Sequence, residues 1–94
     1  MVTQVALVTG SAQGIGEAIA LRFARDGIDV ALLDIHAKQN QLEGIAKKIE
    51  AESRRALVIL ADVSQEEEVK DAVDKTVETL GSLDIVRTMI FSSR

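Results

Sequence analysis

The sequence predicts an α/β protein. It is expected to form part of a doubly wound fold, with a parallel sheet of about four strands in the order 3-2-1-4 and helices on both faces. Three observations predict this class. Short apolar runs alternate with stretches of helical periodicity, and a glycine-rich turn joins the first run to the first helical stretch. No linker, internal repeat or low-complexity segment interrupts the alternation. Strands and helices that alternate at this spacing form βαβ units with right-handed crossovers.

The first half of the chain is expected to contain two strands and two helices. A strand at 4–8 precedes a helix at 14–26, and Gly27 follows at a position where a left-handed helix end favours glycine. The second strand, 28–34, is too apolar for its faces to meet water. A second helix is expected at about 37–53, because apolar residues recur at i, i+3, i+4 and i+7. The apolar positions of these helices are Ile15, Ala18, Ile19, Phe23, Leu42, Ile45, Ala46 and Ile49.

The second half of the chain continues the alternation. A third strand is expected at 55–61 and a fourth at 83–91. Between them, Ser64 followed three residues later by Glu67 has the pattern of a capping box, which predicts a helix start at the serine. Gly81 is expected to end that helix. The acidic run at 66–68 is interpreted as a solvated face favoured by the helix dipole, and not as a metal site. The apolar positions of this helix are Val69, Ala72, Val73, Val77 and Leu80.

Length and composition restrict the possible functions. A chain of 94 residues forms at most one small domain, and such a domain buries only roughly 60–65% of its unfolded surface. The net charge of −4 argues against a nucleic-acid or anionic-membrane partner, which would require clustered Lys and Arg. The absence of cysteine excludes a disulfide framework and a thiolate metal site. No apolar stretch approaches the ~20 residues of a membrane span and no signal-like segment begins the chain, so a cytoplasmic location is expected.

The turn after the first strand carries the strongest functional signal. Its glycines, Gly10, Gly14 and Gly16, have the spacing G-x-x-x-G-x-G and stand between a strand and a helix. Glycine at such a turn lets backbone amides approach a phosphate closely, where a side chain would collide with it. The spacing differs from the G-x-G-x-x-G of the commonest dinucleotide fingerprint. Its place in the chain nevertheless predicts a nucleotide cofactor.

Asp34 strengthens this prediction because it ends the second strand, twenty residues after Gly14. In a doubly wound sheet, a carboxylate there faces the adenosine ribose and accepts hydrogen bonds from its hydroxyls. It would also repel a 2′-phosphate, and Gln13 is uncharged, so NAD is favoured over NADP. The alternatives stay open: His36 and Lys38 can supply positive charge for NADP, and Asp34 can be a strand end that only aids solubility. His36 is interpreted as a loop residue, since one histidine binds no metal unaided.

Together these residues resemble a known family. The motif Thr9-Gly10-x-x-x-Gly14-Ile15-Gly16, with Asp34 and Ala61-Asp62-Val63, is similar to the N-terminal part of the short-chain dehydrogenase/reductase family. The resemblance covers residues 2 to about 86, and the stretch 8–20 is especially similar to members that act on acetoin, diacetyl or butanediol. The 3-oxoacyl reductases and sugar-alcohol dehydrogenases begin alike, so the substrate does not follow. The resemblance implies a partial Rossmann fold and an oxidoreductase of alcohols or ketones.

The resemblance also implies a set of cofactor-binding positions. Asp34 and its neighbour Ile35 would meet the adenosine ribose. Asp62 would accept a hydrogen bond from the adenine amino group, and Val63 would lie along the ring. Without the resemblance, Asp62 would pass as another carboxylate at a strand end. Thr9 would be structural and tie the turn to the fourth strand. The positions that would cradle the pyrophosphate and the adenosine side are Gly10, Ser11, Gln13, Gly14, Ile15 and Gly16.

The end of the chain departs from the family pattern. Arg87 falls within what should be a central strand, where burial of an unpaired guanidinium is costly, and 88–94 is an atypical tail. We interpret this as a truncation or an altered reading frame near the fourth strand. The alternative is a divergent ending with Arg87 on an exposed edge. The apolar segment Met89-Ile90-Phe91 would leave a bare strand edge, which predicts self-association.

The expected function is therefore that of a cofactor-binding part. The catalytic Asn, Ser and Tyr-x-x-x-Lys implied by the family would lie beyond residue 94. The sequence has no tyrosine, and Ser92 and Ser93 receive no catalytic role. Residues 1–94 are expected to bind a nicotinamide dinucleotide, while an alcohol or ketone substrate requires a full-length relative. The alternatives are a non-catalytic NAD-binding or oligomerisation module and an inert gene-model fragment. A methyltransferase-like fold expects a G-x-G-x-G turn and is disfavoured.

Overall fold

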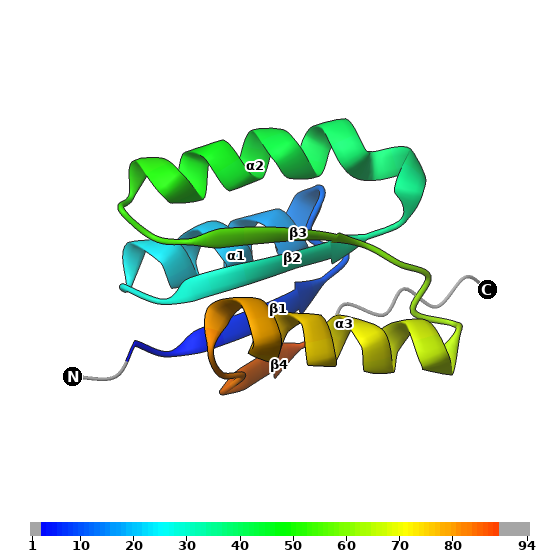
Figure 1. Ribbon diagram of the computed structural model, residues 1–94. Helices are drawn as coiled ribbons and strands as arrows, with labels where there is room; N and C mark the ends of the chain where they lie inside the picture. Colours follow the sequence, from blue (N-terminus) through cyan, green and yellow to red (C-terminus); the bar gives the residue numbers. More distant parts are fainter. Residues whose placement is uncertain (1–2, 89–94) are drawn as a thin grey trace.

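The computed structural model describes residues 3–88, which form a parallel sheet with helices on both sides (Figure 1). The strands are β1 (Val5–Thr9), β2 (Asp29–Asp34), β3 (Ala56–Leu60) and β4 (Ile85–Arg87). The helices are α1 (Gly14–Arg25), α2 (Gln39–Ala51) and α3 (Glu66–Leu80), and a 3-10 turn, η1 (His36–Lys38), precedes α2. The strand order β3-β2-β1-β4 confirms the predicted sheet.

Two apolar clusters cover the two faces of the sheet. The helices α1 and α2 lie on one face and α3 lies on the other (Figure 1). Because both faces of β1 and β2 are covered, these strands are apolar throughout and lack the polar alternation of a half-exposed strand. The strand residues packed under α1 and α2 include Val8, Val30 and Leu32, whereas those under α3 include Val5, Leu7, Ala31 and Leu33.

Small residues form the buried side of α1. Its buried positions are Gly16, Ala20 and Ala24, whose spacing of four residues places them on one side of the helix. Ile15 is 62% exposed and Ala18 is also exposed, so two of the apolar positions of this helix lie away from its packed face. The larger Ile19 and Phe23 pack against the cluster from its margins. The small residues let the backbone of α1 lie close to the sheet.

The packed face of α3 includes a polar residue and leaves one apolar residue exposed. Its buried residues are Ala72, Thr76 and Leu80, whereas Val77 is 44% exposed. The buried Thr76 hydroxyl donates a hydrogen bond to the Ala72 carbonyl oxygen at 2.7 Å. A threonine is accepted at this position because the helix itself satisfies its polar group. Apolar character along the chain therefore does not identify every buried position of this helix.

Two helix starts lie elsewhere than predicted. The capping box at Ser64 is wrong: α3 begins at Glu66 after Gln65, and no side chain caps it. Instead, the amide and the hydroxyl of Ser64 both donate to Asp62, which competes for the serine. The helix expected from residue 37 begins with η1, and α2 itself runs from Gln39 to Ala51. Ser53, expected to end that helix, lies outside it with a φ of 63°.

Two glycines that were expected at helix ends take the left-handed conformation. Gly27 has a φ of 87° after α1, and Gly81 has a φ of 94° after α3. The Gly81 amide donates to the Val77 carbonyl at 2.9 Å, which satisfies a carbonyl in the last turn of the helix. Both expected helix ends are therefore confirmed.

The fourth strand is shorter than predicted within the described residues. It pairs with β1 from Ala6–Ile85 to Val8–Arg87. Arg87 is exposed on this strand. The segment Met89-Ile90-Phe91, the two tail serines and the rest of 89–94 lie outside the described residues, so the tail and its apolar edge stay predictions.

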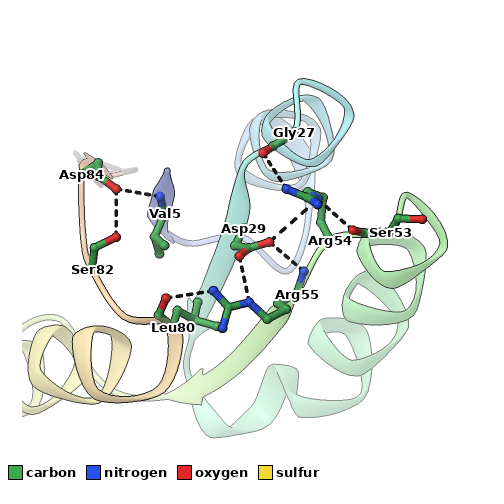
Figure 2. Close-up of polar contacts among 9 residues, drawn as sticks. All are labelled: Val5, Gly27, Asp29, Ser53, Arg54, Arg55, Leu80, Ser82 and Asp84. Atoms are coloured by element: carbon green, nitrogen blue, oxygen red, sulfur yellow. Dashed lines mark hydrogen bonds and ion pairs between the residues drawn. The ribbon is translucent and has the colours of Figure 1, made fainter. Parts of the chain in front are cut away.

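A polar cluster ties the amino-terminal ends of the strands together (Figure 2). The Asp29 carboxylate, 4% exposed, accepts hydrogen bonds from both the backbone amide and Nε of Arg55 at 2.9 Å. The Arg55 guanidinium also donates to the Leu80 carbonyl oxygen at 2.9 Å, and so joins β2 and β3 to the end of α3. Nearby, the Asp84 carboxylate accepts from the Val5 amide at 2.9 Å. These contacts lie at the opposite end of the strands from the glycine turn.

Candidate functional site

The candidate site is a pocket at the carboxyl ends of β1, β2 and β3, where the strand arrows point in Figure 1. Its volume is about 360 Å³. In an open α/β sheet, ligands bind at this edge, next to the point where the strand order reverses. The lining residues are Thr9, Gly10, Gln13, Leu33, Asp34, Ile35, Lys38, Ala61, Asp62 and Val63.

The turn between β1 and α1 forms one wall of the pocket. Gly10 and Gly14 have φ angles of 64° and 61°, a conformation that side chains other than glycine rarely adopt. At Gly16 a Cβ atom would lie 2.8 Å from the Gly10 carbonyl carbon and 3.1 Å from the Ser11 Cα. The third glycine is therefore required by the close approach of α1 to the turn. Gln13 stands immediately before α1, and its side chain does not cap the helix. The first amides of the helix are therefore left without a side-chain acceptor.

Asp34 is joined to the glycine turn by its carboxylate. Oδ2 accepts a hydrogen bond from the Ala12 amide at 3.1 Å, and Oδ1 accepts one from the Ile35 amide at 2.8 Å. The side chain is half-buried and lines the pocket. Each oxygen has a further lone pair, so the carboxylate can still accept hydrogen bonds from a ligand.

The lining of the pocket also contains a lysine. Lys38 belongs to η1, and its Nζ donates to the Gln13 side-chain oxygen at 3.0 Å. Both residues line the pocket. This contact brings a positive charge to the part of the pocket that also contains the Asp34 carboxylate. It joins the segment after β2 to the glycine turn.

The loop after β3 forms the opposite wall. Its residue Asp62 accepts hydrogen bonds from the Ser64 amide at 2.9 Å and the Ser64 hydroxyl at 2.7 Å. Both bonds favour the charged carboxylate, and the hydroxyl bond foremost holds the pKa of Asp62 below its ordinary value of 3.8. The Asp62 amide in turn donates to Glu68 at 2.8 Å. The carboxylate of Asp62 is thus ionised and held in place at neutral pH.

Exposed apolar side chains stand beside these polar groups. Ile35 is 47% exposed and Val63 is 46% exposed, and both line the pocket. Large apolar side chains left open to water beside a few converging polar groups are typical of a small-molecule site. Their positions favour contact with a flat, partly apolar ligand group.

The structure separates the predicted site residues into two sets. Gly10, Gln13, Asp34, Ile35, Asp62 and Val63 line the pocket. Four others do not line it: Ser11, Gly14, Ile15 and Gly16. Ser11 is fully buried, and its amide donates to the Leu33 carbonyl oxygen at 3.3 Å, which ties the turn to β2. Gly14 and Ile15 are exposed at the start of α1, beside the pocket.

Sequence reasoning missed the contacts of Lys38 and Glu68. Lys38 was weighed only as a source of positive charge, and Glu68 only as part of a solvated acidic run. A 3-10 turn brings Lys38 back to Gln13, across 25 sequence positions. Glu68 reaches Asp62 from the first turn of α3, six positions later. The second pair has a local signal, since a strand-end carboxylate followed by a helix start leaves an amide within reach of that first turn.

Two negative findings apply to residues 3–88. Within that range, no three His, Cys, Asp or Glu side chains lie together in an arrangement that could hold a metal ion. None of the helices in the described part of the chain is both long enough and apolar enough to span a membrane.

The strand order, the glycine turn and the pocket at the carboxyl edge define a protein of the Rossmann class. The sequence profile of the short chain dehydrogenase family matches residues 4–88, so the chain belongs to this family. A short-chain dehydrogenase/reductase from Armillaria gallica is 54% identical over 83 residues, which are 88% of this chain and 32% of that protein. L-2,3-butanediol dehydrogenase from Corynebacterium glutamicum is 37% identical over 84 residues, 89% of this chain and 33% of that enzyme. The chain thus spans about a third of the length of these relatives.

Solved structures support the same class. Carveol dehydrogenase from Mycobacterium avium, in complex with NAD, matches with a TM-score of 0.83 and 34% identity, covering 88% of this chain and 34% of that one. L-sorbose reductase from Gluconobacter frateurii, in complex with NADPH and L-sorbose, matches with a TM-score of 0.80 and 33% identity. That match covers 89% of this chain and 32% of the reductase. The expected Rossmann fold and the expected family are therefore confirmed.

Proposed function

We propose that this chain binds NAD and forms the cofactor-binding part of an oxidoreductase that acts on an alcohol or ketone. The observation that carries the proposal is the meeting of Gly10, Asp34 and Asp62 at one pocket, although they are far apart in the sequence. They provide an open backbone at a turn, one carboxylate suited to ribose hydroxyls and one suited to an amino group. This donor and acceptor set fits the adenosine half of a dinucleotide.

Each part of the pocket has a role in the proposal. The uncapped amides at the start of α1 would meet the pyrophosphate, because a helix start carries partial positive charge. Asp34 would accept hydrogen bonds from the adenosine ribose, next to Ile35. On the other wall, Asp62 would accept a hydrogen bond from the adenine amino group, and Val63 would lie along the ring. The nicotinamide end, which exchanges hydride when the cofactor is bound, would extend away from these groups.

NAD is proposed over NADP on electrostatic grounds. A 2′-phosphate would approach the Asp34 carboxylate, and like charges repel. Lys38 acts in the opposite sense, but its ammonium group is bonded to Gln13. In a direct comparison of the two cofactors, NAD is therefore expected to bind more tightly. Lys38→Met is expected to weaken the binding of NADP more than that of NAD.

We further propose that these 94 residues bind the cofactor without catalysing hydride transfer. The sequence contains no tyrosine, so it lacks the proton donor that the family resemblance implies. The substrate and the reaction would belong to a protein of the length of its relatives. The cytoplasmic location stays part of the proposal.

The deciding experiment is a proton–nitrogen correlation spectrum of the 94-residue chain, recorded without and with NAD, with a turnover assay on the same sample. The expected result is a set of shifted signals at Gly10, Gly14, Gly16 and Asp34, with no turnover of added acetoin or butanediol. A dispersed spectrum that NAD leaves unchanged would contradict the binding function. Turnover above the no-protein blank would contradict the non-catalytic assignment.

Self-association through β4 is a second part of the proposal. Within the described residues β4 pairs only with β1, and Val86 on this strand is 53% exposed. An apolar strand with one unpaired edge is a template for a second chain. Sedimentation at tens of micromolar is expected to reveal species larger than the monomer, and Val86→Lys is expected to reduce them. A monodisperse monomer of the unsubstituted chain would exclude this association.

A further inference from the structure

A hydrogen bond from α3 holds the loop that carries Asp62. The backbone amide of Asp62 donates to Oε1 of Glu68 at 2.8 Å, and Glu68 lies in the first turn of α3. Glu68 does not line the pocket that contains Asp62; it borders a separate hollow between β3 and α3. It therefore contacts the loop without being part of the pocket wall.

This bond differs from the other bonds made by Asp62. The carboxylate of Asp62 accepts hydrogen bonds from Ser64. The backbone carbonyl oxygen of Asp62 accepts one from the Gln65 amide at 3.0 Å. Those bonds fold the loop onto itself within three residues. The bond to Glu68 joins the loop to a regular helix that is packed on the sheet through Ala72 and Leu80. It thus sets where the loop stands relative to the rest of the fold.

Glu68 is distinct among the acidic residues at the start of α3. Glu66 and Glu67 are exposed, whereas Glu68 is half-buried. A hydrogen bond between a carboxylate and a backbone amide is charge-assisted and stronger than a neutral one. The acidic run therefore contains one residue with a definite partner, beside two on the solvated face.

We propose that Glu68 is a positioning residue for adenine recognition: it holds the Asp62 backbone so that the Asp62 carboxylate faces the amino group of the adenine. This inference rests on the proposed function, in which that carboxylate accepts a hydrogen bond from adenine. It adds a residue outside the pocket to the set that determines which base the pocket accepts.

The test compares NAD with nicotinamide hypoxanthine dinucleotide, in which a carbonyl oxygen replaces the adenine amino group. The unsubstituted chain is expected to prefer NAD by about tenfold, the value of one charge-assisted hydrogen bond. Glu68→Ala is expected to reduce that preference to about threefold or less. Glu68→Gln keeps a carbonyl oxygen that accepts the Asp62 amide, and it is expected to restore the preference. Glu67→Ala is the matched control and is expected to leave the preference unchanged.

The ratio of the two affinities separates a positioning role of Glu68 from a general loss of stability, because unfolding lowers the apparent affinity for both dinucleotides equally. If Glu68→Ala binds NAD with an unchanged preference, the inference is overturned while the proposed function stands. If the unsubstituted chain binds neither dinucleotide, the proposed function fails and the inference fails with it. The amide proton of Asp62 gives a readout without ligand: its chemical shift is expected to change in Glu68→Ala and to stay near its original value in Glu68→Gln. An unchanged shift in both would contradict the contact itself.

Discussion

The carboxylate of Asp34 accepts a hydrogen bond from the backbone amide of Ala12 at 3.1 Å, across 22 sequence positions. This bond joins the end of β2 to the glycine turn that follows β1. The two segments that would bind the ribose and the pyrophosphate are therefore in direct contact. A change at Asp34 is expected to affect both the acceptor for the ribose and the shape of the turn.

Asp34→Asn is expected to weaken NAD binding by about 1.5–3 kcal/mol, the range for a hydrogen bond to a charged group. NADP binding is expected to weaken less, because the substitution also removes the repulsion of a 2′-phosphate. Titration calorimetry with both cofactors measures the two changes. Asp74→Asn, on the exposed side of α3, is the control and is expected to change neither affinity. Equal losses for both cofactors would contradict the electrostatic account of the preference for NAD.

The glycines of the helices provide a matched pair of substitutions. Gly16→Ala is expected to destabilise the fold by about 1–3 kcal/mol, because its Cβ would stand 2.8 Å from the Gly10 carbonyl carbon and a backbone atom cannot move easily. Gly44→Ala meets open space in α2 and is expected to stabilise the fold by up to about 1 kcal/mol through helix propensity. Urea unfolding followed by circular dichroism measures both. The two substitutions are expected to change the free energy of unfolding in opposite directions. A Gly16→Ala variant as stable as the unsubstituted chain would contradict the close approach of α1 to the turn.

Asp29→Ala tests the polar cluster of Figure 2. It leaves the Arg55 amide and guanidinium without their shared acceptor, and a loss of about 1–3 kcal/mol in the free energy of unfolding is expected. The control is Asp26→Ala, since Asp26 pairs with Arg22 only at the surface, with side chains 48% and 73% exposed. That pair contributes about 0.3–0.5 kcal/mol. Equal losses for the two variants would show that the buried contacts of Asp29 contribute no more to the free energy of unfolding than the exposed pair does.

Ser64→Ala is expected to raise the pKa of Asp62 towards its ordinary value of 3.8, because the larger of the two lowering contacts is removed. The sign of the linked stability follows from this direction. A carboxyl whose pKa is lowered by folding stabilises the folded state at pH values above its unfolded pKa, and this contribution is lost as the pH falls through the lowered value. Carbon NMR of the Asp62 carboxyl group during an acid titration measures the change. Ser82→Ala, whose hydroxyl contacts Asp84 instead, serves as the control and is expected to leave the Asp62 pKa unchanged.

Local sequence patterns predicted the elements well and some of their ends poorly. Glycine marked the ends of α1 and α3 correctly at Gly27 and Gly81, since both take positive φ angles that other residues avoid. The capping box at Ser64 failed because Asp62 binds the same serine. Such a failure is local: two residues compete for one partner, and a pattern that considers only one of them cannot decide between them.

The sequence by itself determined the class of fold, the family and the position of the glycine turn, because strand and helix periodicities and a strand-to-helix turn are properties of neighbouring residues. Only the tertiary structure decided how Asp34 meets the Ala12 amide, that Lys38 reaches Gln13 and that Thr76 rather than Val77 is buried. These contacts depend on the crossover of chain segments and on the rotation of each helix against the sheet. The physical reason is that a hydrogen bond needs its two atoms within about 3 Å, and periodicity along the chain does not specify distances between elements.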